Sequence, residues 1–363
     1  MIHALIVLGS TGGHIYPGLV LGEELRSRGE DAVFIVADRE IARDIVKKSG
    51  FRFSVMAGEG LKRKFSPALG RFVLKFAKGI FQSLAIIIKE RPRVVVGMGG
   101  YLTPQVVLSA RLMGLPVVIH EQNVMPGLAN RMLARIATRI AVSFSATAEY
   151  FPSRKVVFTG NPVRKEILAC SREEGTENLN LDKNRKNILI FGGSQGSSSI
   201  NFAMVSALEF LTPLKDKVQF IHITGIKQFS SLMEAYRKQG YGACVLPYLH
   251  RMEYAYAASD LVISRSGATT LAELVARNLP SVLIPYPHAT EDHQTVNADL
   301  LVREGAAVII PDKDLTGERL ADVLLSLFRQ AGELDWMKEK AGALYSDNSA
   351  GRFADVIESV TKI

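Results

Sequence analysis

Cysteine is scarce in this sequence, whose 363 residues include only Cys170 and Cys244. Two distant cysteines exclude a disulfide framework and a cysteine metal site, and they are typical of a reducing compartment. Long apolar runs are also lacking, because the densest cluster, Leu84–Ile88, is far shorter than the roughly 18 residues of a membrane span. The N-terminus shows no basic leader and continues directly into a predicted strand, Ala4–Leu8. We therefore expect a cytoplasmic protein.

Charge is unevenly distributed along the chain. The net charge is +8, and residues 61–93 hold nine Lys or Arg but only one acid, Glu90. Such a segment attracts nucleic acid, acidic substrates or anionic membranes. No nucleic-acid motif is present, and aromatic residues do not alternate with the basic ones as a stacking platform requires. We expect an anionic membrane surface as partner and no nucleic acid.

An amphipathic helix is predicted over Phe72–Ile88 within this basic segment. Its apolar residues recur at helical spacing, which predicts a buried stripe made of Val73, Phe76, Ala77, Ile80, Phe81, Leu84 and Ile87 or Ile88. The preceding loop, Gly60–Leu69, mixes apolar and cationic residues. We expect this loop, more than the stripe, to contact lipid headgroups.

Strands followed by glycine turns predict an α/β fold. In the first half, Ala4–Leu8 precedes Gly9–Gly13, with a helix starting near Tyr16–Pro17, and Val94–Val96 precedes Gly97–Tyr101. Strand Val117–His120 ends in a polar segment, where open α/β sheets place their ligands. A dinucleotide-binding fold is the rival interpretation, but the G-x-G-x-x-G spacing is absent.

The second half repeats the pattern. A predicted loop, Ser171–Asn187, leads to strand Ile188–Phe191 and a third glycine turn, and helices are predicted at Gly317–Arg329, Leu334–Tyr345 and Arg352–Thr361. We predict an N-terminal domain over 1–160, a C-terminal domain over 161–345, and a helix in 346–363 that packs back on the N-terminal domain. The two doubly wound domains would face a central cleft.

The stretch from Leu261 to Asn297 predicts a nucleotide-sugar site. A strand, Leu261–Ser264, turns into a helix at Thr269–Arg277, whose N-terminus, capped by a threonine, would favour phosphate. Glu273 lies one turn further, where its carboxylate could accept hydrogen bonds from ribose hydroxyls. His293, Gln294 and Asn297 follow the next strand and carry groups suited to sugar hydroxyls. An ordinary strand–helix–strand unit is the alternative interpretation of these residues alone.

Seven ordered motifs resemble the MurG family, the bacterial UDP-N-acetylglucosamine (UDP-GlcNAc) transferases of peptidoglycan synthesis. They are GSTGGHIYPGL, GMGGY, HEQN, GNPVR, GGSQG, RSGATTLAEL and HATEDHQTVNA. The resemblance covers essentially the entire chain and implies a GT-B fold of two Rossmann-like domains. It also implies inverting transfer of GlcNAc to the 4-hydroxyl of the muramoyl sugar in undecaprenyl-pyrophosphoryl-MurNAc-pentapeptide (lipid I), which yields lipid II and UDP.

The same resemblance implies a peripheral location on the cytoplasmic face of the inner membrane and, as partners, UDP-GlcNAc, lipid I and other cell-wall synthesis proteins. It places a set of residues at the donor site: Thr11, Gly12, Gly13, Asn123, Arg164, Ser194, Leu249, Ala268, Thr269, Thr270, Leu271, Glu273 and Gln294. It assigns the acceptor to Gly99, Gly100 and Tyr101, where Leu-Thr-Pro replaces the family's Val-Ser-Gly-Pro after the tyrosine.

Inverting transfer needs a base for the acceptor proton. His14 in the first glycine turn is the first candidate, and His120 and Glu121 are the alternatives. We expect neither a metal nor a cofactor, with the helix dipole, loop N–H groups and Arg164 meeting the charge on UDP. Rival functions are another GT-B lipid glycosyltransferase, a UDP-GlcNAc 2-epimerase, and a regulatory protein that only binds the nucleotide sugar.

Overall fold

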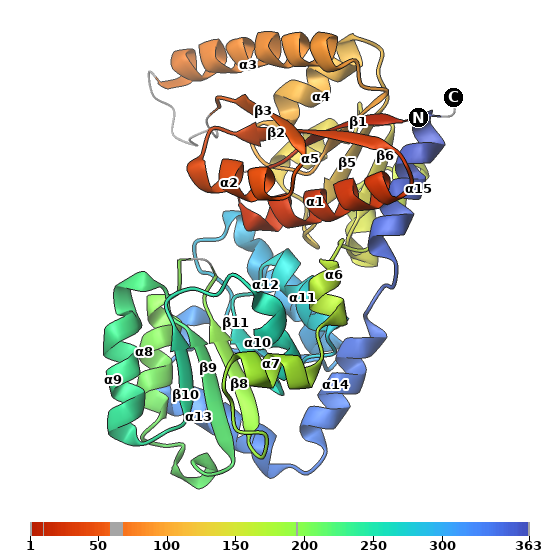
Figure 1. The fold of residues 1–363 in the computed structure, drawn as a ribbon. Coiled ribbons are helices and arrows are strands. Elements are labelled where there is room, and N and C mark those ends of the chain that lie inside the picture. Colours follow the sequence, from red (N-terminus) through yellow and green to blue (C-terminus); the bar gives the residue numbers. More distant parts are fainter. Residues whose placement is uncertain (1, 10, 59–67, 194, 362–363) are drawn as a thin grey trace. The chain divides into compact units, whose positions relative to one another are not determined.

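The computed structural model describes residues 2–9, 11–58, 68–193 and 195–361 (Figure 1). The chain divides into two compact units. Unit 1 comprises Met1–Arg164 together with Ser346–Ile363, and unit 2 comprises Lys165–Tyr345. Each unit is built on one parallel sheet, which confirms the predicted α/β class with two Rossmann-like domains.

Unit 1 contains a seven-stranded parallel sheet in the order β3-β2-β1-β4-β5-β6-β7. Its strands are β1 (His3–Val7), β2 (Asp31–Ala37), β3 (Arg52–Met56), β4 (Val94–Gly97), β5 (Val117–Glu121), β6 (Arg139–Val142) and β7 (Val156–Phe158). Because successive side chains point to opposite faces, β1 sends Leu5 and Val7 into one core and Ala4 and Ile6 into the other. Covering both faces with helices explains why the strands are almost continuously apolar.

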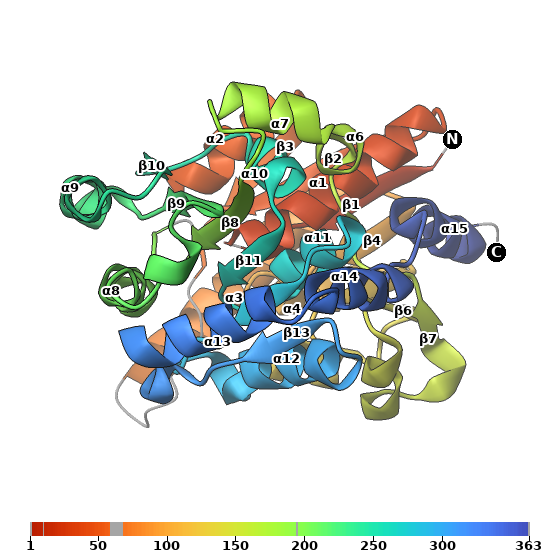
Figure 2. The same ribbon diagram turned by 90° about the horizontal axis from the view of Figure 1, so that it is seen from below.

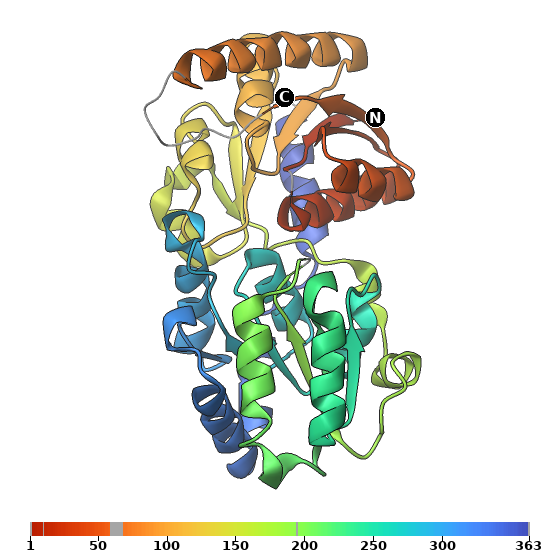
Figure 3. The ribbon, with the colours of Figure 1, turned by 90° about the vertical axis from the view of Figure 1, so that its left-hand side faces the viewer.

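The helices of unit 1 are α1 (Gly12–Ser27), α2 (Glu40–Lys48), α3 (Ala68–Glu90), α4 (Thr103–Leu112), α5 (Leu128–Leu133) and α15 (Ser349–Thr361), with 3₁₀ turns η1 (Ser145–Tyr150) and η2 (Ser153–Lys155). Figures 1 and 3 show α3 lying over α4. Helix α1 begins at Gly12, not near Tyr16–Pro17 as predicted, because the last glycines of the turn already have helical geometry.

The apolar stripe predicted along α3 is only partly correct. Ser83 and Ile87 are buried, whereas 72% of Phe81 is exposed. A helix with apolar residues on two faces can bury only one of them against α4. Here the buried face is that of Gly79 and Ser83, where Gln105 of α4 packs closely against Gly79 and Ser109 of α4 donates to the carbonyl of Ile80. Residues 59–67, which include most of the predicted lipid-contacting loop Gly60–Leu69, lie outside the described residues. No helix in the part of the chain that the structure describes is both long and apolar enough to cross a bilayer.

Unit 2 contains a six-stranded parallel sheet in the order β10-β9-β8-β11-β12-β13. The strands are β8 (Lys186–Phe191), β9 (Val218–Ile223), β10 (Ala243–Leu246), β11 (Leu261–Ser264), β12 (Ser281–Leu283) and β13 (Ala307–Ile309). The helices are α6 (Lys165–Ala169), α7 (Arg172–Asn178), α8 (Ser198–Ala207), α9 (Phe229–Gln239), α10 (Met252–Ala258), α11 (Ala268–Ala276), α12 (His293–Arg303), α13 (Gly317–Arg329) and α14 (Glu333–Ala343). Figures 1 and 2 show α8 and α9 beside the β8–β10 part of the sheet.

Helix α7 corrects the prediction of a loop over Ser171–Asn187. It begins with a capping box, in which the Ser171 hydroxyl accepts from the backbone N–H of Glu174 and the Glu174 carboxylate accepts from the N–H of Ser171. This reciprocal pair satisfies two N–H groups that a helix start would otherwise leave without partners. The Ser-x-x-Glu signal is present in the sequence, within a segment whose polarity by itself favours a loop.

The C-terminal helix α15 belongs to the core of unit 1. Phe353 is fully buried and its ring lies 4.9 Å from the imidazole of His120. On the outer side, Arg28 of α1 donates to Asp355 at 2.6 Å, to Glu358 at 2.8 Å and to the carbonyl of Gly351 at 3.0 Å. These carboxylates raise the pKa of Arg28. Packing therefore holds α15, and the arginine sets its position against α1.

We predict that Phe353→Ala weakens unit 1 selectively. Loss of a buried phenylalanine lowers the free energy of unfolding by about 3–5 kcal/mol. Hydrogen exchange measured by mass spectrometry should therefore be faster in β1 and β4 of the variant than in those strands of the parent. Phe202→Ala is the matched control, because Phe202 is an exposed phenylalanine on α8 of unit 2, and it should change stability by no more than about 0.5 kcal/mol. Equal exchange in Phe353→Ala and the parent would show that α15 does not hold this core.

Candidate active site

The loops after β1, β4 and β5 meet at the carboxyl edge of unit 1's sheet because these three strands are neighbours. Two of the glycine turns touch each other. A Cβ on Gly100 would lie 2.8 Å from the Cα of Gly9, and Gly100 has a φ of +84°. The close approach of the Gly9 backbone and the positive φ each require glycine at position 100. Tyr101, the third residue of the predicted acceptor group, packs partly against the core under α4.

His14 lies in the first turn of α1, between these two glycine turns. Its Nδ1 lies 3.0 Å from the hydroxyl of Thr11. A Cβ on Gly99 would lie within 3.0 Å of the imidazole, and one on Gly9 within 2.8 Å. The ring is therefore oriented by Thr11 and confined by two glycines, and it remains partly exposed. Such an imidazole is held in one orientation at a sheet edge where ligands bind.

His120 has different surroundings, although it is the next histidine on the same sheet edge. It is fully buried, with its Nδ1 3.0 Å from Gln122 Nε2 and its Nε2 3.3 Å from the Ser143 hydroxyl. Burial lowers its pKa to about 3. The imidazole is therefore neutral near pH 7, and its nitrogens face protein groups.

Glu121 is also buried, and its carboxylate organises the following loop. One oxygen accepts from the backbone N–H and the side-chain amide of Asn123, and the other accepts from the N–H of Gly127 and the amide of Asn130. Burial raises the pKa of this carboxyl group, while the four N–H donors oppose that shift. The geometry suits a group that positions Asn123.

Arg164 closes unit 1 next to the first glycine turn. Its guanidinium lies 4.3 Å from the ring centroid of Tyr16, which follows His14 by two residues. This cation–π contact orients the arginine beside the first glycine turn. Gly12 and Gly13, two further predicted donor residues, lie in the same first turn of α1.

The predicted donor residues of unit 2 lie along the carboxyl edge of its sheet. Helix α11 follows β11, and its N-cap is Gly267 with no side-chain cap. The predicted threonine cap is therefore wrong, because the extended Gly267 ends the turn and places Ala268 through Leu271 in the first helical turn. Leu249 follows β10, the strand at one end of the sheet. Ser194 lies outside the described residues.

Glu273 and Gln294 are both held by neighbours. Glu273 is only 6% exposed, and one of its carboxylate oxygens accepts from the Tyr256 hydroxyl at 2.9 Å. The side-chain oxygen of Gln294 accepts from the N–H of Tyr286 at 2.9 Å, and its carbonyl accepts from the Ser266 hydroxyl at 2.7 Å. These bonds fix the start of α12 against the turn that precedes α11.

Two other predicted sugar-contacting residues have structural partners. Asn297 is fully buried and donates to the carbonyl of Ser266 at 3.3 Å. His293 Nδ1 lies 2.6 Å from the carbonyl of Thr290. Just before it, Glu291 and Asp292 both have positive φ, a strained conformation for side-chain-bearing residues. Strain of this kind persists where surrounding contacts over-determine a loop.

Arg265 also lies at the carboxyl edge of the sheet of unit 2, and the sequence did not predict a role for it there. Its guanidinium donates to Asp312 at 2.5 Å, to the carbonyls of Ile284 and Pro285, and to the hydroxyls of Ser197 and Ser199. The arginine thereby connects the loops after β8, β11, β12 and β13. No local pattern could reveal it, because its partners lie 19 to 68 residues away.

The same contact bears on metal binding. Asp312 and Asp314 form the chain's one Asp-x-Asp tripeptide, which the prediction of a metal-free donor site did not take into account. The Asp312 carboxylate is already engaged by Arg265 and by Ser199. Within the described residues, no group of three or more His, Cys, Asp or Glu side chains could hold a metal ion.

Two doubly wound parallel sheets with glycine turns at their carboxyl edges place the chain in the class of proteins with two Rossmann-like domains, which bind their ligands at those edges. Two domain models identify the family: the N-terminal domain of glycosyltransferase family 28 matches residues 4–142, and its C-terminal domain matches residues 187–358. The chain belongs to this family and is a glycosyltransferase.

Full-length relatives are consistent with this assignment. The chain is 40% identical to the UDP-N-acetylglucosamine–N-acetylmuramyl-(pentapeptide) pyrophosphoryl-undecaprenol N-acetylglucosamine transferase of Halothermothrix orenii, over 98% of both chains. It is 39% identical to the enzyme of the same name from Myxococcus xanthus, over 98% of this chain and 92% of that one. The crystal structure of Acinetobacter baumannii MurG matches with a TM-score of 0.80 and 27% identity, over 99% of this chain and 100% of that one. The resemblance to the MurG family is confirmed.

We predict that the His120 imidazole stays neutral down to about pH 5. Its folded pKa of about 3 lies below the ordinary value of 6.5, so the unfolded chain binds the proton more readily between those values. Stability should therefore fall as the pH drops below 6.5, by up to about 1.4 kcal/mol per pH unit from this group.

NMR of the imidazole C–H signals of His120, assigned with a His120→Gln variant, checks this prediction. The signals should not shift between pH 8 and pH 5. His222 of unit 2 is buried with a similarly lowered pKa of about 3, so a stability measurement alone would not separate the two units. A His120 signal that titrates near pH 6.5 would contradict the prediction.

Proposed function

We propose that the protein transfers GlcNAc from UDP-GlcNAc to the muramoyl 4-hydroxyl of undecaprenyl-pyrophosphoryl-MurNAc-pentapeptide, with inversion at the anomeric carbon. The observation that supports this most directly is Glu273, a nearly buried carboxylate in α11, placed just after a helix N-terminus without a side-chain cap. A ribose diol and a diphosphate need those two features in that order. The names of the full-length relatives supply the two substrates.

The donor is assigned to unit 2. The first turn of α11, from Ala268 to Leu271, carries the positive end of the helix dipole and would receive the diphosphate. The Tyr256 hydroxyl holds Glu273 in place, and the Glu273 carboxylate would accept hydrogen bonds from the ribose hydroxyls. Gln294, fixed beside the same turn, would contact the sugar hydroxyls.

His14 is assigned as the general base. In the transfer, the acceptor oxygen attacks the anomeric carbon on the face opposite UDP, the bond from that carbon to the diphosphate breaks, and the acceptor proton passes to the base. His14 is partly exposed and oriented by Thr11, whereas His120 and Glu121 are enclosed by protein donors and acceptors. We therefore assign His120 and Glu121 as positioning residues, and Asn123 as the residue that Glu121 presents.

The negative charge that develops on UDP needs stabilisation without a metal in this proposal. The N-terminal dipole of α11 and backbone N–H groups of the glycine turns would supply it, together with the cation of Arg164. Gly99 and Gly100 let the second glycine turn lie directly against His14 and the first glycine turn, so the proposed acceptor residues stand next to the proposed base.

Transfer of label from radiolabelled UDP-GlcNAc to a lipid I analogue, without added metal, tests the function. His14→Gln should lower kcat by about 10²- to 10⁴-fold while leaving the UDP-GlcNAc Kd within about twofold of the parent. Glu273→Ala should instead raise that Kd by about 10- to 100-fold, because a charged hydrogen bond contributes about 1.5–3 kcal/mol.

His3→Gln is the matched control, since His3 lies at the opposite end of β1 from the loop that carries His14. It should leave both kcat and Kd unchanged. Unchanged binding in Glu273→Ala would overturn the donor site, and less than a tenfold loss of turnover in His14→Gln would overturn the base. Epimerised sugar formed without acceptor would favour the 2-epimerase interpretation.

The lipid-linked acceptor implies work at a membrane surface, and α3 supplies a candidate contact. Leu74, Phe81 and Ile88 are exposed and are spaced seven residues apart, so they lie along one face of the helix. Lys75, Lys78 and Lys89 are exposed on the same helix. Apolar residues flanked by lysines favour an anionic lipid surface. We propose that the protein associates peripherally with the cytoplasmic face of the inner membrane through the exposed face of α3 that carries Leu74, Phe81 and Ile88.

We predict that replacing Leu74, Phe81 and Ile88 together by serine lowers binding to phosphatidylglycerol vesicles at least tenfold in a sedimentation assay. Binding by the parent should also weaken as salt rises, because the lysine contribution is screened. Serine at Phe202, Phe210 and Ile226, which are exposed apolar residues of unit 2, provides the control and should bind like the parent. Equal losses in both triple variants, or binding that salt does not affect, would contradict the proposal.

A further inference from the structure

Gln122 lies between the buried imidazole of His120 and the second glycine turn of unit 1, residues 97–101. It is the first residue after β5 and is only 3% exposed. Its side-chain nitrogen, Nε2, lies 2.8 Å from the carbonyl oxygen of Met98 and 3.0 Å from Nδ1 of His120. Met98 is the first residue after β4, the strand that pairs with β5. Gln122 therefore connects the carboxyl ends of two neighbouring strands.

The groups around Gln122 determine which atoms donate. The carbonyl of Met98 can only accept, so the amide must turn its nitrogen, which carries two hydrogens, to this side. The second hydrogen of the same nitrogen points at Nδ1 of His120, which must accept it. A neutral imidazole carries its proton on one nitrogen, and here that nitrogen is Nε2, 3.4 Å from the carbonyl of Gly160. His120 is therefore in the Nε2–H tautomer.

Gln122 also orients a peptide group of the second glycine turn. The Met98–Gly99 peptide is trans and planar, so a carbonyl held by Gln122 directs the N–H of Gly99 to the opposite side. No backbone carbonyl among the described residues accepts from that N–H. At the next peptide, the buried hydroxyl of Thr103 donates to the carbonyl of Gly99 at 2.7 Å. Two side chains from different parts of unit 1 therefore fix the peptide groups on either side of Gly99.

The same glycine stands next to the proposed base. A Cβ on Gly99 would lie 3.0 Å from Nε2 of His14 and 3.6 Å from the side-chain oxygen of Gln122. The backbone of the turn is thus enclosed between the two side chains. A shift of the turn would change the distance between His14 and an acceptor bound there, and a misplacement of about 1 Å can lower turnover by about 10²-fold.

We propose that Gln122 is a positioning residue of the transfer reaction. It holds the second glycine turn in the orientation in which the acceptor hydroxyl meets His14, and the Nε2–H tautomer of His120 orients the Gln122 amide. This inference rests on the proposed function, in which the turn binds the acceptor. Gln122 acts through the turn and contacts neither substrate. Donor binding is assigned to unit 2 and should not depend on it.

A glutamine of unit 2 provides the matched control. Gln219 is also buried, and its side-chain nitrogen also makes two hydrogen bonds, to the carbonyl of Asp182 at 2.7 Å and to the side-chain oxygen of Asn187 at 2.8 Å. Gln219 is the second residue of β9, so it lies at the amino edge of its sheet. Gln122→Met and Gln219→Met thus remove equivalent interactions, but only Gln122→Met removes them beside a glycine turn.

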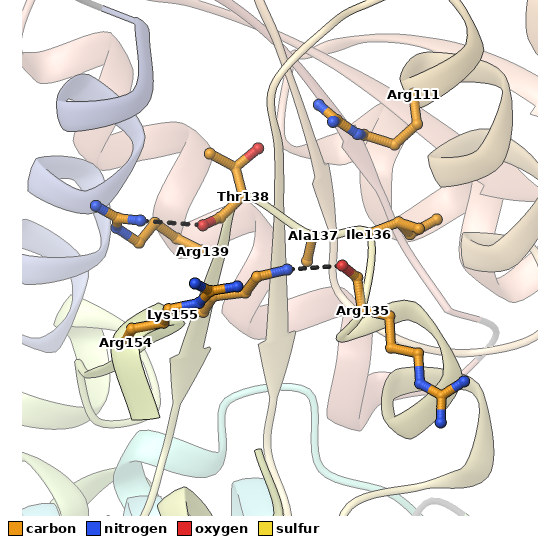
Figure 4. A pocket seen from close by; sticks show the side chains of 8 residues that line it. All are labelled: Arg111, Arg135, Ile136, Ala137, Thr138, Arg139, Arg154 and Lys155. Atoms are coloured by element: carbon orange, nitrogen blue, oxygen red, sulfur yellow. Dashed lines mark hydrogen bonds between the residues drawn. The ribbon is translucent and has the colours of Figure 1, made fainter. Parts of the chain in front are cut away.

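A second control lies at the other end of β5. The hydroxyl of Thr138 accepts from the N–H of Val117, the first residue of that strand, at 3.0 Å. Figure 4 shows Thr138 just before β6, among the basic residues that line a pocket there. Thr138→Val removes a hydrogen bond within unit 1 and leaves the carboxyl edge of the sheet unchanged.

Kinetics with a lipid I analogue, measured at saturating UDP-GlcNAc, test the proposal. Gln122→Met should lower kcat/KM for the acceptor by at least about tenfold, because the turn is no longer held in place. The UDP-GlcNAc Kd should stay within about twofold of the parent, since the hydrogen bonds of Gln122 lie outside unit 2. Gln219→Met and Thr138→Val should leave both quantities within about twofold of the parent. Thermal unfolding should show a lower Tm for all three variants, since each leaves hydrogen-bonding groups without their partners.

The tautomer of His120 provides a readout that does not require activity. Nitrogen NMR of the imidazole, assigned with the His120→Gln variant, should show the proton on Nε2 in the parent protein. A proton on Nδ1 would overturn the inference, because Nδ1 could then not accept from Gln122.

Two kinetic results would also refute the positioning role. One is a loss of acceptor kcat/KM in Gln122→Met that is no larger than in the two controls. The other is an equal weakening of UDP-GlcNAc binding by Gln122→Met, which would indicate a general defect. Failure of the proposed function is a different result, because the parent itself would then transfer no label to the acceptor.

Discussion

All strands of each sheet run parallel, and this one constraint determines where the chemistry of the molecule lies. Because every strand ends at the same edge, loops that are far apart in the sequence become neighbours there without any contact designed between them. In unit 1 this brings the turn after β1 against the turn after β4 and places the end of β5 alongside. In unit 2 it gathers the loops after β8, β11, β12 and β13 around a single guanidinium, that of Arg265. The buried strands keep this edge of the sheet rigid, and the loops that follow them can differ in sequence without disturbing it.

The sequence predicted those features that depend on local pattern. The limits of Leu261–Ser264 and Gly317–Arg329 were predicted as the structure has them, since each has a clear period and clear stop signals. Helix α7 was missed although its capping box is visible in the sequence. The burial of Phe81 was predicted wrongly because periodicity identifies an apolar face but not which of two such faces meets a neighbour.

Long-range contacts account for the rest. Nothing near His120 in the sequence indicates that Phe353 covers it. This contact, together with those to Gln122, Ser143 and the carbonyl of Gly160, encloses the imidazole. The same holds for Glu121, whose pattern in HEQN suits either a base or a support for a loop. The motifs therefore predicted at which edge of the sheet the candidate residues lie. They did not predict which candidate reacts and which only positions another residue, because that depends on contacts with residues outside the motif.

The docking of α15 makes the order of synthesis matter. Unit 2 is one continuous segment and contains every strand of its own sheet, so it can complete its core as soon as it has been made. Unit 1 is synthesised first but lacks Phe353, Val356, Ile357 and Val360 until the chain has passed through the whole of unit 2. During that interval one face of its sheet exposes apolar surface and the Arg28 side chain has no partners on α15. The first domain to emerge is thus the second to finish folding, and its exposed face is where a chaperone or an aggregation contact would act.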